Sequence, residues 1–229
     1  MPLTWLTICY NTYSRLLICV KGNIMTIEKK RNAEASIKKI IEVAQNLFAE
    51  KGFKATTLSE IGEYSGLSRT TPSYFFKNKE LLYKSAVQAL IADEQRFVET
   101  LDYSDEVSIP ILKDLLYRHI YYTYKNPNLA KILVRESMSK NPHNWIYEYV
   151  PGTVSWSHQY LVKAQEVGII RPDLDTFIVW LDAMAMAWLP IITQNTFFKS
   201  LNTDVFSEDF IEKQVKQMTT LLFESIINK

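Results

Sequence analysis

The chain has 229 residues, enough for a sizeable hydrophobic core in one large domain or in a small domain joined to a larger one. Its 47% hydrophobic and 13% aromatic residues, with six glycines and eight prolines, exclude a disordered protein and favour a compact, mostly helical one. Residues 1–90 carry 13 Lys and Arg against 7 Asp and Glu, and residues 91–229 carry 13 against 18, so only the front part suits a polyanionic partner.

The opening segment, MPLTWLTICYNTYSRLLICV, is apolar but lies outside every periodic pattern. We expect residues 1–32 to be a flexible N-terminal extension, with Met25 as the biological start. A secretory signal is the alternative, although the segment has neither a basic leading region nor a clear small-residue cleavage site. Cys9 and Cys19 form neither a disulfide framework nor a metal-ligand set.

The first predicted helix precedes Gly52. Apolar residues from Ile37 to Phe48 recur with the spacing of one helix face, and Gly52 can end that helix in a left-handed conformation. A basic run upstream, which contains Lys29, Lys30 and Arg31, is either a solvated segment or a contact to a nucleic-acid backbone.

A second, short helix is predicted from the pattern TLSE, in which Thr57 is followed three residues later by Glu60 as in a capping box. Gly66 then turns the chain. A longer helix followed by two short helices with a tight glycine turn between them is a helix-turn-helix unit, and the second short helix enters the DNA major groove.

The start of this recognition helix is ambiguous in the sequence. If Ser68 is the N-cap, Pro72 is the fifth residue and its missing amide costs one internal hydrogen bond. If Thr71 is the N-cap, Pro72 takes the first helical position, where proline is favoured. In both cases Pro72 lies in the first turn. A further helix is predicted to begin after Asn78 as its cap.

Residues 40–83, IIEVAQNLFAEKGFKATTLSEIGEYSGLSRTTPSYFFKNKELLY, resemble the DNA-binding domain of the tetracycline-repressor (TetR) family. The resemblance covers about a fifth of the chain. It implies an all-α fold with a three-helix helix-turn-helix DNA-binding domain at residues 33–84 and a helical effector-binding and dimerisation domain at residues 85–229. The matching residues are Leu47, Phe48, Gly52, Phe53, Thr56, Thr57, Ile61, Gly66, Leu67, Ser68, Phe76, Lys79, Glu80 and Leu82.

Within this unit we expect DNA contacts at the leading edge of the recognition helix and at helix starts. Arginine can bind guanine through two hydrogen bonds and a threonine methyl can pack on thymine, so Arg69, Thr70 and Thr71 are candidates for base contact. The resemblance implies phosphate contacts by others of the set, although Thr57 is also a cap and Tyr74 could equally pack. The full candidate set is Thr56, Thr57, Ser68, Arg69, Thr70, Thr71, Ser73, Tyr74 and Lys79.

This sequence departs from the family pattern inside the recognition helix. Thr70 stands where the family often has glycine, Pro72 replaces an aliphatic residue and Ser73 replaces a tyrosine. Phe48, Ile61 and Phe76 are instead assigned to the core.

The remaining chain predicts further helices and no convincing strand. The longest apolar run, from Phe177 to Ile192, is shorter than the ~20 residues of a membrane span and contains Asp182 and Pro190, so we expect a buried helix and a cytoplasmic protein without a membrane partner. The predicted helices are 86–101, 110–124, 129–139, 145–167, 175–194 and 207–227.

This back part is expected to bind a largely apolar small-molecule effector. Ligand pockets are mostly apolar with a few polar anchors, although bulky residues at helical spacing also form plain core. Asp182 could meet a cationic effector, contribute to a dimer contact or face water. The candidates are Tyr121, Tyr122, Trp156, His158, Tyr160, Trp180, Asp182, Met184 and Trp188.

The resemblance further implies a homodimer through the last two helices, which would place two recognition helices roughly 34 Å apart on a palindromic operator. The predicted function is a ligand-responsive transcriptional repressor without a cofactor or metal. The alternatives are a helical enzyme, for which the sequence offers no catalytic motif, and an adaptor in which the helix-turn-helix only packs against protein.

Overall fold

The computed structural model describes residues 27–101, 107–148 and 150–227, with side chains left undescribed at 27–30, 147 and 150–156. The predictions for residues 1–24, for Met25 and for the side chains of Lys29, Lys30 and Trp156 lie outside this part. Within it the fold is all-α, as predicted, and the only bridge between extended residues is an isolated one that pairs Ile170 with Ile227.

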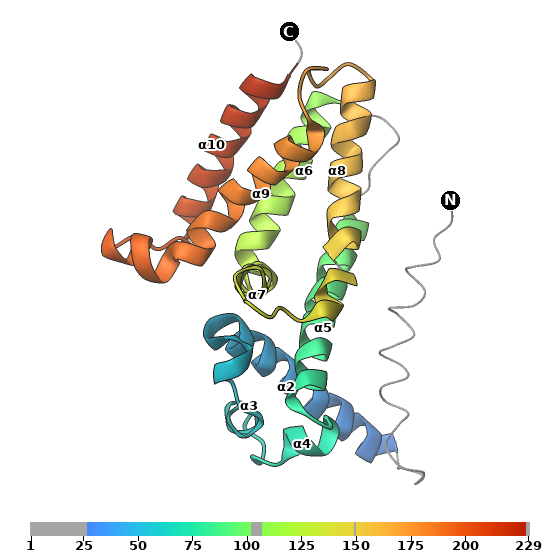
Figure 1. The fold of residues 1–229 in the computed structure, drawn as a ribbon, viewed down its shortest axis with the longest axis vertical. Helices are drawn as coiled ribbons and strands as arrows, with labels where there is room; N and C mark the ends of the chain where they lie inside the picture. The colour runs from blue at the N-terminus through green and yellow to red at the C-terminus, as the bar shows by residue number, and fades with distance from the viewer. Residues whose placement is uncertain (1–26, 102–106, 149, 228–229) are drawn as a thin grey trace. The chain divides into compact units, whose positions relative to one another are not determined.

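The described helices follow the chain in the order drawn in Figure 1. A 3-10 helix precedes α8 and a π-helix follows α9. The helices are α2 (Ile27–Ala55), α3 (Leu58–Tyr64), α4 (Thr71–Phe75), α5 (Lys79–Thr100), α6 (Ile109–Lys125), α7 (Asn128–Ser137), the 3-10 helix (Asn144–Glu148), α8 (Val150–Glu166), α9 (Thr176–Thr193), the π-helix (Gln194–Phe198) and α10 (Glu208–Ile226).

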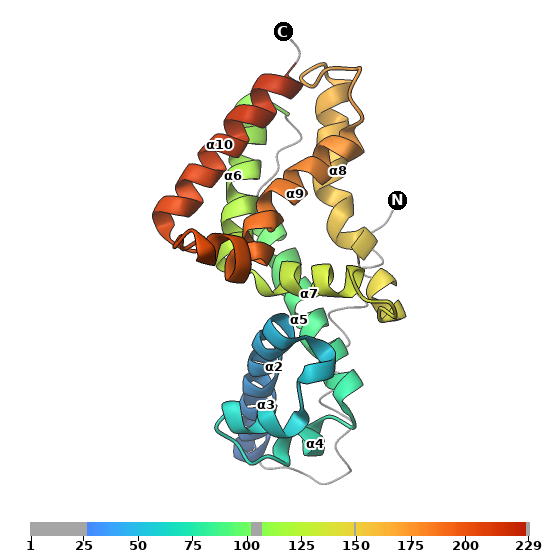
Figure 2. The same cartoon turned by 60° about the vertical axis from the view of Figure 1, so that its left-hand side comes forward.

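The chain forms two compact units, one ending at Asp93 and one beginning at Glu94. The boundary falls within α5. In the first unit α2, α3 and α4 pack on one another, and Figure 2 shows α3 and α4 beside α2. The residues predicted to form this core are confirmed, because Phe48, Ile61 and Phe76 are all buried.

Local signals explain how the helices of the first unit begin and end. The backbone of Gly52 has φ +79° and ψ 168°, which interrupts the helical geometry of α2 at the predicted residue. Thr57 caps α3, because its side chain accepts a hydrogen bond from the Glu60 amide at 3.2 Å. Asn78 caps α5 in the same way, accepting from the Leu81 amide at 2.9 Å.

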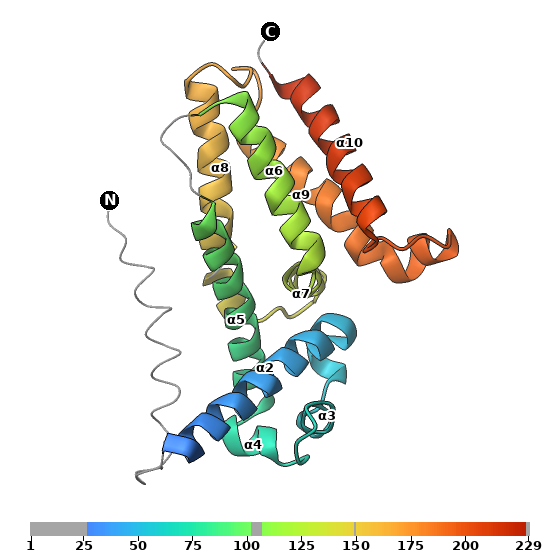
Figure 3. The same cartoon turned by 180° about the vertical axis from the view of Figure 1, so that it is seen from behind.

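The second unit is a layered set of helices in which α6 contacts α9 and α10, and α8 contacts α9. Figure 3 shows α6 in front of α9, with α8 and α10 on its two sides. Two of its helices have caps where the sequence predicts their starts: Asp175 accepts from the amides of Phe177 and Ile178, and Ser207 accepts from the amide of Phe210.

One predicted helix is divided in the structure. The segment 145–167 consists of the 3-10 helix at Asn144–Glu148 and α8 from Val150. Pro151 lies in the first turn of α8, where the missing amide would have no helical acceptor. A proline there favours a new helix start over a continuous helix.

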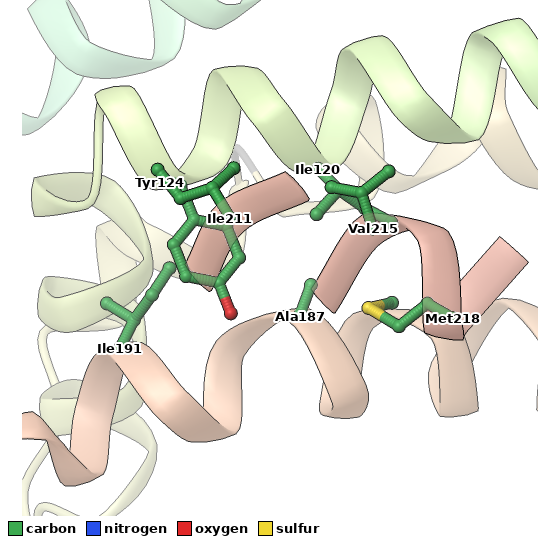
Figure 4. Close-up of a cluster of buried hydrophobic side chains, with 7 residues drawn as sticks. All are labelled: Ile120, Tyr124, Ala187, Ile191, Ile211, Val215 and Met218. Atoms are coloured by element: carbon green, nitrogen blue, oxygen red, sulfur yellow. The ribbon is translucent and has the colours of Figure 1, made fainter. Parts of the chain in front are cut away.

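A hydrophobic cluster joins α6, α9 and α10 (Figure 4). Its seven buried members are Ile120, Tyr124, Ala187, Ile191, Ile211, Val215 and Met218. Tyr124 is the largest of them, and its hydroxyl points toward α9 without a hydrogen-bond partner among the described residues. The desolvation of this group raises its pKa above the ordinary tyrosine value.

The prediction of a buried helix at Phe177–Ile192 is wrong. The segment Thr176–Phe198 is long and apolar enough to cross a membrane by length and composition, yet only 28% of the 18-residue apolar stretch within it is buried in the structure. The residues on one side, among them Ile178, Leu181 and Leu189, are exposed. α9 therefore has more apolar residues than packing within this chain buries.

Candidate functional site

The turn between α3 and α4 is set by backbone hydrogen bonds and by one glycine. The Leu67 amide donates to the Gly62 carbonyl at 3.0 Å, and the Ser65 hydroxyl donates to the Ile61 carbonyl at 2.6 Å. Gly66 has φ +65°, a backbone conformation that costs free energy for a residue with a side chain. The chain thus leaves α3 in a tight turn, as the sequence predicts for a helix-turn-helix.

Neither Ser68 nor Thr71, the two residues considered from the sequence, is the N-cap of α4. The helix begins at Thr71, flanked by Thr70, whose side chain makes no capping bond. Pro72 is the second helical residue and has no amide to donate, but the Ser68 carbonyl that would accept from it is satisfied by the Thr71 amide at 3.0 Å. Pro72 therefore leaves no buried acceptor without a donor.

Pro72 is buried because it packs against α3 at Gly62. A Cβ atom at Gly62 would lie 2.6 Å from the Ser68 carbonyl oxygen, 3.0 Å from the Arg69 Cα and 3.1 Å from the Pro72 Cδ. This contact between α3 and α4 was not predicted from the sequence. A glycine inside a short amphipathic helix is the only sequence signal for such a close approach.

The residues around the start of α4 form an exposed polar surface. Arg69 is exposed and its guanidinium lies 3.0 Å from the Glu63 carboxylate on α3. The Ser68 hydroxyl lies 2.7 Å from that of Thr71 and 3.1 Å from that of Thr70. Donors and acceptors are thus gathered at the start of this short helix.

The later candidates on α4 are exposed as well. The side chain of Ser73 faces solvent, and Tyr74 is 71% exposed, with its ring edge-on to Phe75 at 5.0 Å. An aromatic side chain with so much exposed area is not part of the core. The alternative that Tyr74 merely packs inside this unit is therefore not supported.

The two threonines before α3 have different positions. Thr56 is fully buried, and its hydroxyl lies within hydrogen-bond distance of the Gly52 carbonyl at 2.9 Å and the Leu47 carbonyl at 3.3 Å. Thr57 is exposed and caps α3. The burial of Thr56 favours a structural role, whereas Thr57 is accessible at a helix N-terminus.

Lys79 ties the start of α5 to the end of α2. Its ammonium donates to the carbonyls of Phe53 at 2.8 Å, Thr56 at 2.9 Å and Lys54 at 3.3 Å. The Nζ atom also lies 4.4 Å from the centre of the Phe53 ring. These bonds match the three donors of a lysine, so the structure gives Lys79 an internal role and its phosphate contact stays a prediction.

The second unit contains an apolar cavity of about 80 Å³ between four helices. The lining residues are Leu112, Leu115, Leu116 and His119 from α6, Ser157, Tyr160 and Leu161 from α8, Val179, Trp180, Ala183 and Met184 from α9, and Leu222, Phe223 and Ile226 from α10. None of these described residues carries a formal charge at neutral pH.

Three of the residues predicted to bind an effector line this cavity: Tyr160, Trp180 and Met184. The Trp180 indole donates to the Ser157 hydroxyl at 2.9 Å, which joins α8 and α9 across the cavity wall. The sequence does not single out Ser157.

The other described candidates do not line the cavity. The Tyr121 hydroxyl donates to Glu208, Tyr122 stacks on Phe97 with ring centres 4.0 Å apart, and Trp188 packs against the buried cluster of Figure 4. The imidazole Nε2 of His158 lies 3.2 Å from the Thr176 hydroxyl. Asp182 is exposed on α9.

His119 is the functional candidate that sequence reasoning missed. It is buried within α6 and lines the cavity, and this burial lowers its pKa to about 4, so the imidazole is neutral at physiological pH. A lone histidine in an amphipathic helix has no companion motif in the sequence. Only its position on the inner face of α6 identifies it.

An exposed apolar face covers one side of α9. Ile178, Leu181, Leu189 and Ile192 follow one another at helical spacing and are each at least 40% exposed. Ala185 lies in the middle of this stripe, and α10 adds the exposed Leu221. We call these residues the α9 face.

The first unit of the chain matches a known protein family. Residues 40–86 match the model of bacterial regulatory proteins of the tetR family. IcaR of Staphylococcus epidermidis, a negative transcriptional regulator of the biofilm operon icaADBC, is 32% identical over 143 residues, which cover 61% of this chain and 75% of IcaR. The chain belongs to the TetR family.

Other transcriptional regulators match over different lengths. The regulator RutR of Escherichia coli strain K12 is 33% identical over 72 residues, which cover 31% of this chain and 34% of RutR, about a third of that relative's length. Among solved structures, the ketosteroid transcriptional regulator KstR2 of Mycobacterium tuberculosis aligns with a TM-score of 0.63 at 16% identity, covering 92% of this chain and 100% of KstR2.

A second solved structure, the fatty acid degradation regulator FadR of Bacillus halodurans, aligns with a TM-score of 0.60 at 18% identity, covering 83% of this chain and 95% of FadR. At such identity these structures establish a shared TetR-family fold. They do not identify a ligand for this chain.

Proposed function

We propose that this TetR-family protein is a cytoplasmic repressor that binds a palindromic DNA operator as a homodimer and releases it when a small-molecule effector enters the helical unit. The single observation that carries the proposal is the exposed polar surface around α4. It presents one arginine and five hydroxyl-bearing side chains, those of Ser68, Thr70, Thr71, Ser73 and Tyr74, on a helix-turn-helix, the positions from which such a helix contacts a major groove.

Arg69, Thr70 and Ser73 are the proposed base-reading residues. The Glu63 carboxylate holds one edge of the Arg69 guanidinium, and the remaining donors can address guanine. Ser68, Thr71, Tyr74 and Thr57 are proposed to bind phosphate, because hydroxyl groups and helix N-terminal amides are common phosphate donors. Lys77, exposed immediately after α4, joins this set.

The α9 face is proposed to be the dimer interface. Contiguous exposed apolar residues mark an interaction surface, and a twofold axis lets the same stripe from two copies pair with itself. Asp182 lies beside the stripe and is exposed, and a charge is costly in a lipid environment, which favours a protein partner for this face. The small Ala185 at its centre permits close approach of two helices.

The proposed effector site is the cavity between α6, α8, α9 and α10. Effector binding releases DNA only if the occupied cavity favours one conformation of the protein over another. The relative IcaR is a negative regulator, which supports repression rather than activation of transcription.

A DNA-binding assay in a salt series tests the proposal. Fragments from the regions upstream of the gene and its neighbours are titrated with the full chain, and we expect a shifted complex whose affinity falls steeply as salt rises. Arg69→Ala is expected to weaken binding by about tenfold or more, because one bidentate base contact contributes roughly 1–3 kcal/mol.

Arg118→Ala is the matched control, because Arg118 is another exposed arginine whose partner, Asp114, is also on the surface. It should bind DNA like the wild type. If Arg69→Ala and Arg118→Ala bind alike, the assigned surface is wrong. If no fragment is bound, the protein is not a local regulator.

A further inference from the structure

We infer that the effector of this cavity is an uncharged, compact and mostly apolar molecule that places a single hydrogen-bonding group against His119. The inference rests on the proposed function in taking the cavity as the effector site. It goes further in assigning the chemical class of the ligand and the residue that recognises its polar group.

The walls of the cavity are uncharged at the described residues. None of the described residues that line the cavity is Asp, Glu, Lys or Arg. An ionised ligand would therefore leave water without meeting an opposite charge, at a cost of several kcal/mol. Asp182, the predicted partner of a cationic effector, is exposed on α9 and does not line the cavity.

Four of the described lining residues carry a nitrogen or oxygen in the side chain: His119, Ser157, Tyr160 and Trp180. Trp180 and Ser157 are already hydrogen-bonded to each other at 2.9 Å, so the indole N–H is committed within the wall. His119 lies on α6, another helix of the lining, and its burial keeps the imidazole neutral, with one nitrogen a donor and the other an acceptor. Such a group matches a hydroxyl, a carbonyl or an amide.

The cavity is also small. An apolar cavity of about 150 Å³ accommodates benzene, so a cavity of about 80 Å³ requires a compact ligand and some movement of its walls. Met184 lines the cavity, and a methionine side chain is unbranched and adjusts readily to the shape of a neighbour. A small ring with one substituent is a suitable probe.

The experiment measures binding of four matched probes to the full chain without DNA, by calorimetry at pH 7.5. Benzyl alcohol, toluene, benzoate and benzylamine share one ring and differ in charge and in the polar group. We expect benzyl alcohol to bind about tenfold or more tightly than benzoate or benzylamine, and several-fold more tightly than toluene.

Two histidine variants test the assignment to His119. His119→Leu should bind benzyl alcohol and toluene equally while retaining toluene binding, because the apolar walls remain. His158→Leu is the matched control and should keep the preference for the alcohol, because His158 is bonded to Thr176 and does not line the cavity. Ring resonances of His119 in the wild type should shift more with benzyl alcohol than with toluene, which tests the contact without a substitution.

The inference is overturned if either charged probe binds as tightly as the alcohol, if the alcohol preference survives in His119→Leu, if the His119 resonances respond equally to both neutral probes, or if none of the four probes binds. Operator binding is measured separately. A failed probe series with intact operator binding therefore refutes the ligand class, whereas failure of operator binding refutes the proposed function.

Discussion

Gly62 and Pro72 together hold the recognition helix in place. The missing side chain at Gly62 admits the Ser68 carbonyl and the Pro72 ring to the surface of α3. A five-residue helix such as α4 is too short to be stable alone, so its position depends on this contact.

Gly62→Ala should destabilise the first unit by roughly 1–3 kcal/mol, because the added methyl would lie 2.6 Å from the Ser68 carbonyl oxygen, a backbone atom. Urea unfolding measures this loss. Ser59→Ala, at an exposed position on the same helix, should change stability by no more than about 0.5 kcal/mol. Equal stability of the two variants would show that α3 and α4 separate without cost.

The buried His119 makes stability depend on pH. Its folded pKa of about 4 lies below the ordinary value of 6.5, so between these values the unfolded chain binds more protons and stability falls as the pH is lowered. We expect His119 to account for a loss of about 3 kcal/mol between pH 6.5 and pH 4. The free energy of unfolding of His119→Leu should not show this loss between pH 6.5 and pH 4.

Glu94 changes stability with pH in the opposite direction to His119. The effect of His119 is therefore measured as the difference between the wild type and the His119→Leu variant. Burial raises its pKa to about 7, so its contribution to stability is present at low pH and is lost as the pH rises from about 4.5 to 7. The difference between the wild-type and His119→Leu curves cancels this contribution. A difference that does not vary between pH 4 and 6.5 would contradict a neutral buried His119.

At the scale of elements, helix starts with a local cap were predictable and the start of α4 was not. Thr57 and Asn78 each accept a hydrogen bond from an amide three residues later, a pattern that the sequence itself contains. The start of α4 depends instead on Pro72 meeting Gly62, a contact between two helices. Local chemistry could not choose between Ser68 and Thr71 for this reason.

Lys79 connects two elements, because its ammonium binds three carbonyls near the end of α2. Lys79→Met should lower the free energy of unfolding by about 2–4 kcal/mol, since the carbonyls lose charge-assisted hydrogen bonds. Lys77→Met removes the same charge two residues earlier, from an exposed side chain, and should leave stability nearly unchanged. Denaturant unfolding of both variants makes the comparison, and equal curves would refute the internal role.

At the scale of the whole molecule, the sequence predicted the two kinds of helical unit but not the surroundings of individual residues in the second. Tyr160, Trp180 and Met184 line the cavity, whereas Tyr121, Tyr122 and Trp188 pack or bond elsewhere. A helix-period pattern shows that a residue is on an apolar face. Which neighbouring helix that face meets depends on packing between distant segments.

The apolar run in α9 illustrates the same limit. Composition predicts burial but cannot distinguish burial within one chain from burial in an assembly. The α9 face is exposed in the isolated chain, and pairing of two copies would complete its burial.

Leu189→Glu should therefore convert a dimer into monomers, because it places a charge within the α9 face, where Leu189 is 58% exposed. Sedimentation velocity measures the change, and operator affinity should fall with it. Val167→Glu, equally exposed after α8, should leave the assembly intact. A Leu189→Glu protein that sediments like the wild type would exclude this face as the interface.

Because Pro72 packs on Gly62, the residues that hold α4 in place differ from those that are available to contact DNA. The residues that fix the helix face inward, and Arg69, Thr70, Ser73 and Tyr74 face outward. New side chains at the four outward positions could redirect the protein to another operator while the scaffold stays unchanged. Exchange at Gly62 or Pro72 would instead disturb every contact at once, so libraries for altered operator preference should keep both residues fixed.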